Sequence, residues 1–78
     1  MEKEKYLKIA MESLSKVFSE AGARATIDVM AKLKLSAVSD VDQNLINLCN
    51  STLTERVKML KGDAIAVQFH KSIKAASG

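Results

Sequence analysis

The chain contains 78 residues, of which 47% are hydrophobic, and carries a formal net charge of +3 at pH 7. Because a chain of this length supports only one hydrophobic core, we expect a single domain covering residues 1–78. Its one cysteine and one histidine exclude an internal disulfide and provide no ligand pattern for a metal. Neither a signal-peptide pattern nor the roughly twenty apolar residues of a membrane span is present. These features predict a soluble, cytoplasmic protein without cofactors.

Residues 3–21 carry apolar side chains at the three- and four-residue spacing of an amphipathic helix. Tyr6 borders this apolar stripe, and Ile9 points away from it. Gly22 interrupts the pattern, because the apolar residues that follow it do not continue the same face. The sequence therefore predicts a break at Gly22 and a second helix over residues 23–35. The first stripe comprises Leu7, Ala10, Met11, Leu14, Val17, Phe18 and Ala21.

A short turn, 36–39, leads into a central helix predicted over residues 40–61. Asp40 is its expected N-cap, with Gln43 in the position that completes a capping box. Apolar side chains cover about half of the circumference, which is wider than a surface helix needs. Ile46 lies at the margin of this arc. The arc comprises Val41, Leu45, Leu48, Cys49, Leu53, Val57, Met59 and Leu60.

Two of the apolar residues on the central helix carry specific expectations. Leu48 is predicted to lie in the core, and Cys49 is predicted to be a buried, unreactive thiol. The opposite side of the helix forms an uncharged polar stripe, which is either a solvated face or a hydrogen-bonding surface. It comprises Gln43, Asn44, Asn47, Asn50, Ser51 and Thr54.

Gly62 is expected to end the central helix, and Asp63 to cap a last helix over residues 63–76. The spacing of Ile65, Phe69 and Ile73 favours this helix, although residues 64–69 also alternate as a strand would. No turn carries a hairpin signature. The four amphipathic segments together predict an all-α fold, a small four-helix bundle.

The positive charge is unevenly distributed along the chain. Acidic and basic residues balance over residues 1–54, so the excess lies entirely in residues 55–78. We expect any anionic partner to contact this last third of the chain. Its charged residues are Arg56, Lys58, Lys61, Lys71 and Lys74 on the basic side and Glu55 and Asp63 on the acidic side.

Arg56 falls inside the apolar arc of the central helix, where a charge needs a partner. Its side chain either extends past the edge of the core or pairs with an acid such as Asp63 or Glu20. Alternatively, it lines an interface with a subunit or partner, where arginine is enriched.

Catalytic constellations are absent from the sequence. A nucleophilic Cys49 would need a base, and the only candidate, His70, lies on another predicted helix without a supporting motif. His70 itself is expected to be partly exposed at the border of an apolar face, with a switch or ligand role less favoured. The glycines are scattered and form no phosphate loop. We therefore expect no enzymatic activity.

The favoured function is a small, non-catalytic protein-interaction or regulatory module. The alternative is a DNA-binding protein in which helices 23–35 and 40–61 form a helix-turn-helix-like pair. Asp40 and Asp42 oppose that alternative, since they would repel phosphates. The candidate interaction residues for both functions are Asn44, Asn47, Ser51, Thr54, Arg56, Lys58, Lys61, Lys71 and Lys74.

Self-association, most simply as a homodimer, follows from the thin, aromatic-poor core. The predicted contact surface consists of apolar side chains that lie outside the faces of their own helices, Tyr6, Ile9 and Val67.

Overall fold

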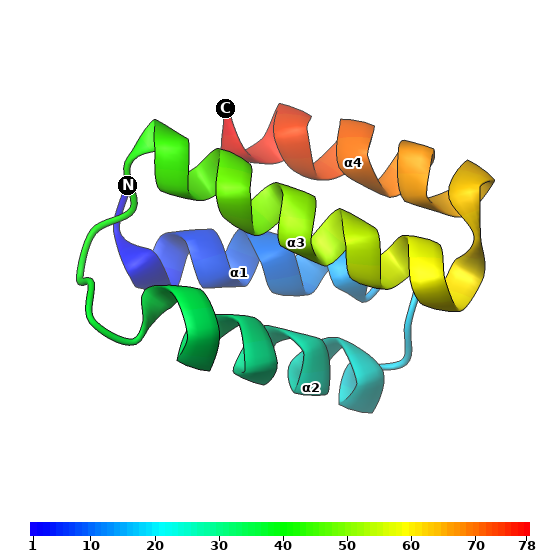
Figure 1. Ribbon diagram of the computed structural model, residues 1–78, viewed down its shortest axis with the longest axis horizontal. Helices are drawn as coiled ribbons and strands as arrows, with labels where there is room; N and C mark the ends of the chain where they lie inside the picture. Colours follow the sequence, from blue (N-terminus) through cyan, green and yellow to red (C-terminus); the bar gives the residue numbers. More distant parts are fainter.

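The computed structural model describes residues 1–78 and contains four α-helices and no β-strand. Consecutive helices run in alternating directions (Figure 1), and each packs on two others, so that the four close around one core. The predicted all-α four-helix bundle is confirmed, and residues 64–69 are helical. No helix combines the length and the hydrophobicity required to cross a bilayer. The helices are α1 (Lys3–Leu14), α2 (Glu20–Met30), α3 (Gln43–Lys61) and α4 (Asp63–Ser77).

The core draws on every helix and on the segment before α3. Its largest fully buried side chains are Tyr6, Leu14, Met30, Leu35, Val41, Cys49, Leu53, Val57 and Ile73.

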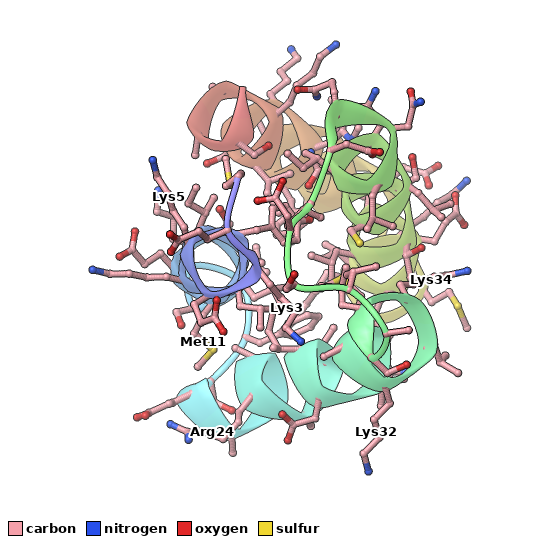
Figure 2. The ribbon with its side chains drawn as sticks, turned by 90° about the vertical axis from the view of Figure 1, so that its left-hand side faces the viewer. Lys3, Lys5, Met11, Arg24, Lys32 and Lys34 are labelled. Atoms are coloured by element: carbon pink, nitrogen blue, oxygen red, sulfur yellow. The ribbon has the colours of Figure 1, made fainter.

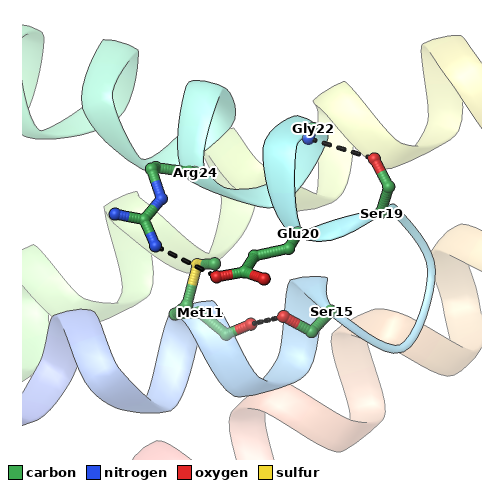
Figure 3. Close-up of polar contacts among 6 residues, drawn as sticks. All are labelled: Met11, Ser15, Ser19, Glu20, Gly22 and Arg24. Atoms are coloured by element: carbon green, nitrogen blue, oxygen red, sulfur yellow. Dashed lines mark hydrogen bonds and ion pairs between the residues drawn. The ribbon is translucent and has the colours of Figure 1, made fainter.

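The connection between α1 and α2 lies earlier in the chain than predicted. α1 ends at Leu14, and Ser19 caps α2 by accepting a hydrogen bond from the Gly22 backbone nitrogen at 3.3 Å (Figure 3). The predicted helix 3–21 and the break at Gly22 are therefore wrong. A serine N-cap followed by an acidic residue, Glu20, starts a helix more strongly than one glycine breaks it.

Gly22 has a steric role in the first turn of α2. A Cβ atom at this position would lie 3.3 Å from the Phe18 Cβ, which is a tight contact.

Near the start of α2, Arg24 donates a hydrogen bond to Glu20 at 3.1 Å (Figure 3). Both side chains of this ion pair are exposed, so it contributes little to stability.

α2 continues into a π-helical turn, η1 (Ala31–Leu35). Met30 and Leu35 are both buried, although they lie five positions apart in the sequence, whereas Lys34 is exposed. With ordinary α-helical spacing, Lys34 would follow Met30 on the inward face. The wide turn thus keeps the lysine in solvent and brings Leu35 into the core.

The connection between η1 and α3 is longer than the predicted turn, and α3 begins at Gln43. Asp42 is the N-cap, because its side chain accepts a hydrogen bond from the Leu45 backbone nitrogen at 2.8 Å. The assignment of Asp40 as the cap is wrong. The backbone of Asp40 instead pairs with that of Glu2 in an isolated antiparallel bridge.

This bridge attaches the start of the chain to the connection that precedes α3. The Val41 backbone nitrogen donates to the Met1 carbonyl oxygen at 2.7 Å, and the Lys3 backbone nitrogen donates to the Ser39 carbonyl oxygen at 3.2 Å. The Lys3 ammonium also reaches the Leu35 carbonyl oxygen at 3.4 Å, whereas Lys5 and Lys32 point away from the bundle (Figure 2). The start of the chain therefore binds the region between η1 and α3 through two backbone hydrogen bonds and one side-chain hydrogen bond.

The inward face of α3 is rotated relative to the predicted arc. Ile46 and Asn50 are buried, whereas Leu48 is 48% exposed and Met59 and Leu60 are also exposed. The predicted core position of Leu48 and the solvent-facing position of Asn50 are therefore wrong. Cys49 is buried as predicted.

A hydrogen-bonded network allows Asn50 to be buried. The Tyr6 hydroxyl donates to Asn50 Oδ1 at 2.6 Å, and Asn50 Nδ2 donates to Ser77 Oγ at 3.1 Å. Ser77 Oγ in turn donates to the Ile73 carbonyl oxygen at 2.7 Å. Because each buried polar atom has a partner, the network escapes the penalty of an unsatisfied group.

This network also corrects the predicted self-association surface. Tyr6 is fully buried, because its ring fills the core while its hydroxyl finds an acceptor on α3. Ile9 is partly buried and packs against the core. Of the three predicted residues, Val67 alone is exposed.

The connection between α3 and α4 is a single residue, Gly62, with φ +91°. This positive φ explains why glycine is required there. Asp63 is the first residue of α4 and makes no capping hydrogen bond, contrary to prediction. Its carboxylate instead lies 3.8 Å from the Lys58 ammonium.

Burial in the core raises the pKa of the Tyr6 phenol above its ordinary value, and the nearby Cys49 raises it further. Above about pH 10 the unfolded chain releases this proton while the folded chain retains it. The free energy of unfolding should therefore fall as the pH rises above about 10, and less steeply in a Tyr6→Phe variant. Tyr6 is the sole tyrosine, so its ultraviolet absorbance reports the ionisation directly. Tyrosinate that forms while the helical circular dichroism is intact would contradict this prediction.

Candidate interaction surfaces

An apolar groove runs between α2 and α3, with a volume of about 180 Å³. Met30 and Leu53 form its buried floor, and Leu33 and Met59 stand at its edges, 72% and 78% exposed. Exposed side chains of this size next to a hollow are typical of a contact surface rather than of scattered surface residues. The apolar groove is lined by Thr26, Val29, Met30, Leu33, Thr52, Leu53, Glu55, Arg56 and Met59.

The sequence produces this groove by supplying more apolar surface than the core uses. The arc on α3 is wide, and the core takes the side centred on Cys49, Leu53 and Val57, which leaves Met59 outside. Val29 on α2 and Leu33 on η1 both line the groove and are both exposed. The excess apolar surface therefore lies on α2, η1 and α3, not on Tyr6 and Ile9.

Arg56 is exposed on the wall of the apolar groove, next to Glu55. It forms no ion pair; Asp63 pairs with Lys58 and Glu20 pairs with Arg24. The predicted pairing of Arg56 with Asp63 or Glu20 is therefore wrong.

A second hollow, the polar groove, lies between α3 and α4 and has a volume of about 230 Å³. Thr54 supports it from α3: its hydroxyl donates to the Asn50 carbonyl oxygen at 2.7 Å and lies 3.1 Å from His70 Nδ1. None of the residues that line the groove is hydrophobic. It is lined by Asn47, Asn50, Ser51, His70 and Lys74.

The predicted interaction residues do not form one surface. Asn47, Ser51 and Lys74 come together in the polar groove with Thr54 beside them, whereas Arg56 lies in the apolar groove on the other side of α3. Asn44 is exposed in the first turn of α3 and Lys71 is exposed on α4; neither lines the apolar groove or the polar groove.

The two remaining lysines lie toward the end of α3 and have local contacts. Lys58 faces Asp63, and the Lys61 ammonium lies 5.8 Å from the centroid of the Phe18 ring. The lysine–ring distance is in the range of a cation–π interaction.

The helices of the predicted DNA-binding pair, α2 and α3, contact each other and run in opposite directions in the view of Figure 1. The connection between η1 and α3, residues 36–42, is longer than the predicted turn over residues 36–39. The helix-turn-helix-like pairing and DNA binding both stay predictions.

The structure does not bring the one cysteine and the one histidine together. Burial raises the pKa of the Cys49 thiol, although the charge of Lys34 partly opposes this effect. His70 contacts Thr54 rather than Cys49. No three side chains among His, Cys, Asp and Glu lie close enough together to hold a metal.

Comparison with protein-family models, curated proteins and solved structures gives no match to this chain.

Proposed function

We propose that this chain is a non-catalytic helical interaction module that self-associates, two copies meeting at their apolar grooves. The observation that supports this proposal is the combination of a hollow with exposed large apolar residues on both of its edges. Covering Val29, Leu33 and Met59 would remove apolar area from water, which is the main driving force of association.

The charges beside the apolar groove favour a second copy as its occupant. A two-fold interface brings the same patch of both subunits together, so it needs a surface complementary to itself. Glu55 and Arg56 provide this, because the acid of one copy would pair with the base of the other. Pairing across the interface would also give Arg56 the counter-ion that it lacks within the chain.

Sedimentation equilibrium at micromolar concentrations tests the proposal. The wild-type chain should exceed its monomer mass of 8.5 kDa as concentration rises, and a Leu33→Lys, Met59→Lys variant should remain monomeric. Val67→Lys is the matched control: Val67 is also exposed but lies on α4, so this change should leave the association intact. A wild-type chain that stays at the monomer mass would overturn the proposal.

Charge-reversal variants test whether Glu55 of one copy pairs with Arg56 of the other. Arg56→Glu should weaken the dimer by at least about tenfold, because it places acids against acids across the interface. Combining it with Glu55→Arg should restore association, since the two charges are then exchanged within each copy. A double variant that is as weak as the single variant would rule out the proposed two-fold pairing.

A further inference from the structure

We infer that the polar groove between α3 and α4 is a binding site for a phosphate group. This inference does not depend on self-association, because the polar groove and the apolar groove lie on opposite sides of α3 and share no residue.

The residues that line the polar groove include a positive charge but no negative charge. The lining contains a cation, Lys74, and hydrogen-bonding groups on Asn47, Ser51 and His70, but no carboxylate and no apolar side chain. Every side chain that lines the groove therefore carries a polar group able to contact a polar ligand. A positive charge with neutral donors around it favours an anion.

His70 is oriented toward this role by Thr54. The single hydroxyl proton of Thr54 is already donated to the Asn50 carbonyl oxygen at 2.7 Å. At the 3.1 Å contact with His70 Nδ1, the Thr54 oxygen can then accept a hydrogen bond from the ring. This contact engages Nδ1 and leaves His70 Nε2 to interact with a ligand.

The number of polar groups favours phosphate over carboxylate. The groove offers four such groups, on Lys74, Ser51, Asn47 and His70, whereas a carboxylate spreads its acceptors over only two oxygens and carries one negative charge. A phosphate offers three acceptor oxygens and nearly two negative charges. Its charge also suits residues 55–78, which carry the whole positive excess of the chain.

The volume limits what accompanies the phosphate. About 230 Å³ exceeds the space of a few water molecules, yet it lies below the roughly 300–1,000 Å³ of sites for drug-sized ligands. The polar groove therefore suits inorganic phosphate or a small phosphate monoester rather than a nucleotide.

Proton NMR can test this assignment, because His70 is the only histidine and its Cε1–H signal needs no assignment. At fixed pH, inorganic phosphate and glycerol phosphate should each shift this signal in a saturable manner. Tighter binding of glycerol phosphate would indicate a monoester ligand, and equal affinities would indicate free phosphate; either result supports a phosphate site. An equal response to acetate would overturn the assignment.

Two lysine variants separate a site from general attraction to positive charge. Lys74→Gln should weaken binding by about tenfold, since it removes a charge-assisted hydrogen bond. Lys71→Gln removes the same charge from an exposed position on α4 outside the polar groove, so affinity should be retained. Equal losses in the two variants, or a shift that never saturates in the wild-type chain, would refute the proposed site.

Discussion

Replacing Leu53 with alanine is expected to lower the free energy of unfolding by about 2–5 kcal/mol. Leu53 is 1% exposed and lies on the central helix of the bundle, so its removal leaves a cavity that the surrounding helices fill only in part. A domain of this size has a total stability of about 4–12 kcal/mol. Urea denaturation followed by far-ultraviolet circular dichroism would measure the loss.

Leu48→Ala is the matched control, because it makes the same substitution on the same helix. Leu48 is 48% exposed, and its truncation removes less buried surface and leaves no closed cavity. We expect a loss of about 1 kcal/mol or less. A loss from Leu48→Ala that equals or exceeds the loss from Leu53→Ala would show that the inward face of α3 is assigned incorrectly.

Breaking the hydrogen bond between Tyr6 and Asn50 is expected to have the second-largest effect. Tyr6→Phe removes the donor and leaves the buried Asn50 Oδ1 without its partner, at a cost of about 1–3 kcal/mol. Asn50→Leu should cost a similar amount, because it leaves the buried Tyr6 hydroxyl without an acceptor. Ser77 remains satisfied in both variants through the Ile73 carbonyl oxygen.

The double variant distinguishes this account from two independent packing defects. When both partners become apolar, no polar group is left unsatisfied, so the combined loss should fall below the sum of the single losses by about 0.5–3 kcal/mol. Chemical denaturation of the wild-type chain, the two single variants and the double variant completes the cycle. Strict additivity would contradict a direct interaction between the two side chains.

The helical fold could be predicted from the sequence because spacing and end signals agree for several segments. Gly62 ends α3 with a positive φ, and the spacing from Ile65 to Ile73 correctly favours a helix. Helix ends were predicted less well, as the start of α3 shows. The capping-box pattern with Gln43 favoured Asp40 as the cap, but the backbone of Asp40 pairs with Glu2, and Asp42 caps the helix instead.

The burial of Tyr6 and Asn50 could not be predicted from local pattern. An asparagine is expected in solvent unless a partner is known, and its partner lies 44 residues away on α1. Once Asn50 turns inward, α3 rotates and Leu48 becomes partly exposed. The burial of Cys49 was predictable because it lies near the centre of both the predicted arc and the observed inward face.

The two candidate surfaces could be predicted from the sequence to different extents. The polar groove was partly predictable, because Asn47, Ser51 and Thr54 recur on one face of α3 and Lys74 lies in the basic third of the chain. The position of the apolar groove was not predicted from the sequence. The excess width of the α3 arc indicated such a surface, but the side left uncovered depends on how α2 packs.

The π-helical turn has a consequence for how the length of this chain can vary. It accommodates one residue more per turn than an α-helix, so it is equivalent to a single-residue insertion between Met30 and Leu35. A chain with one residue fewer in this interval would form an ordinary helical turn with Met30 and Leu35 still on the inward face. In related sequences, this turn is therefore where a one-residue deletion would be tolerated without moving either flanking element out of register.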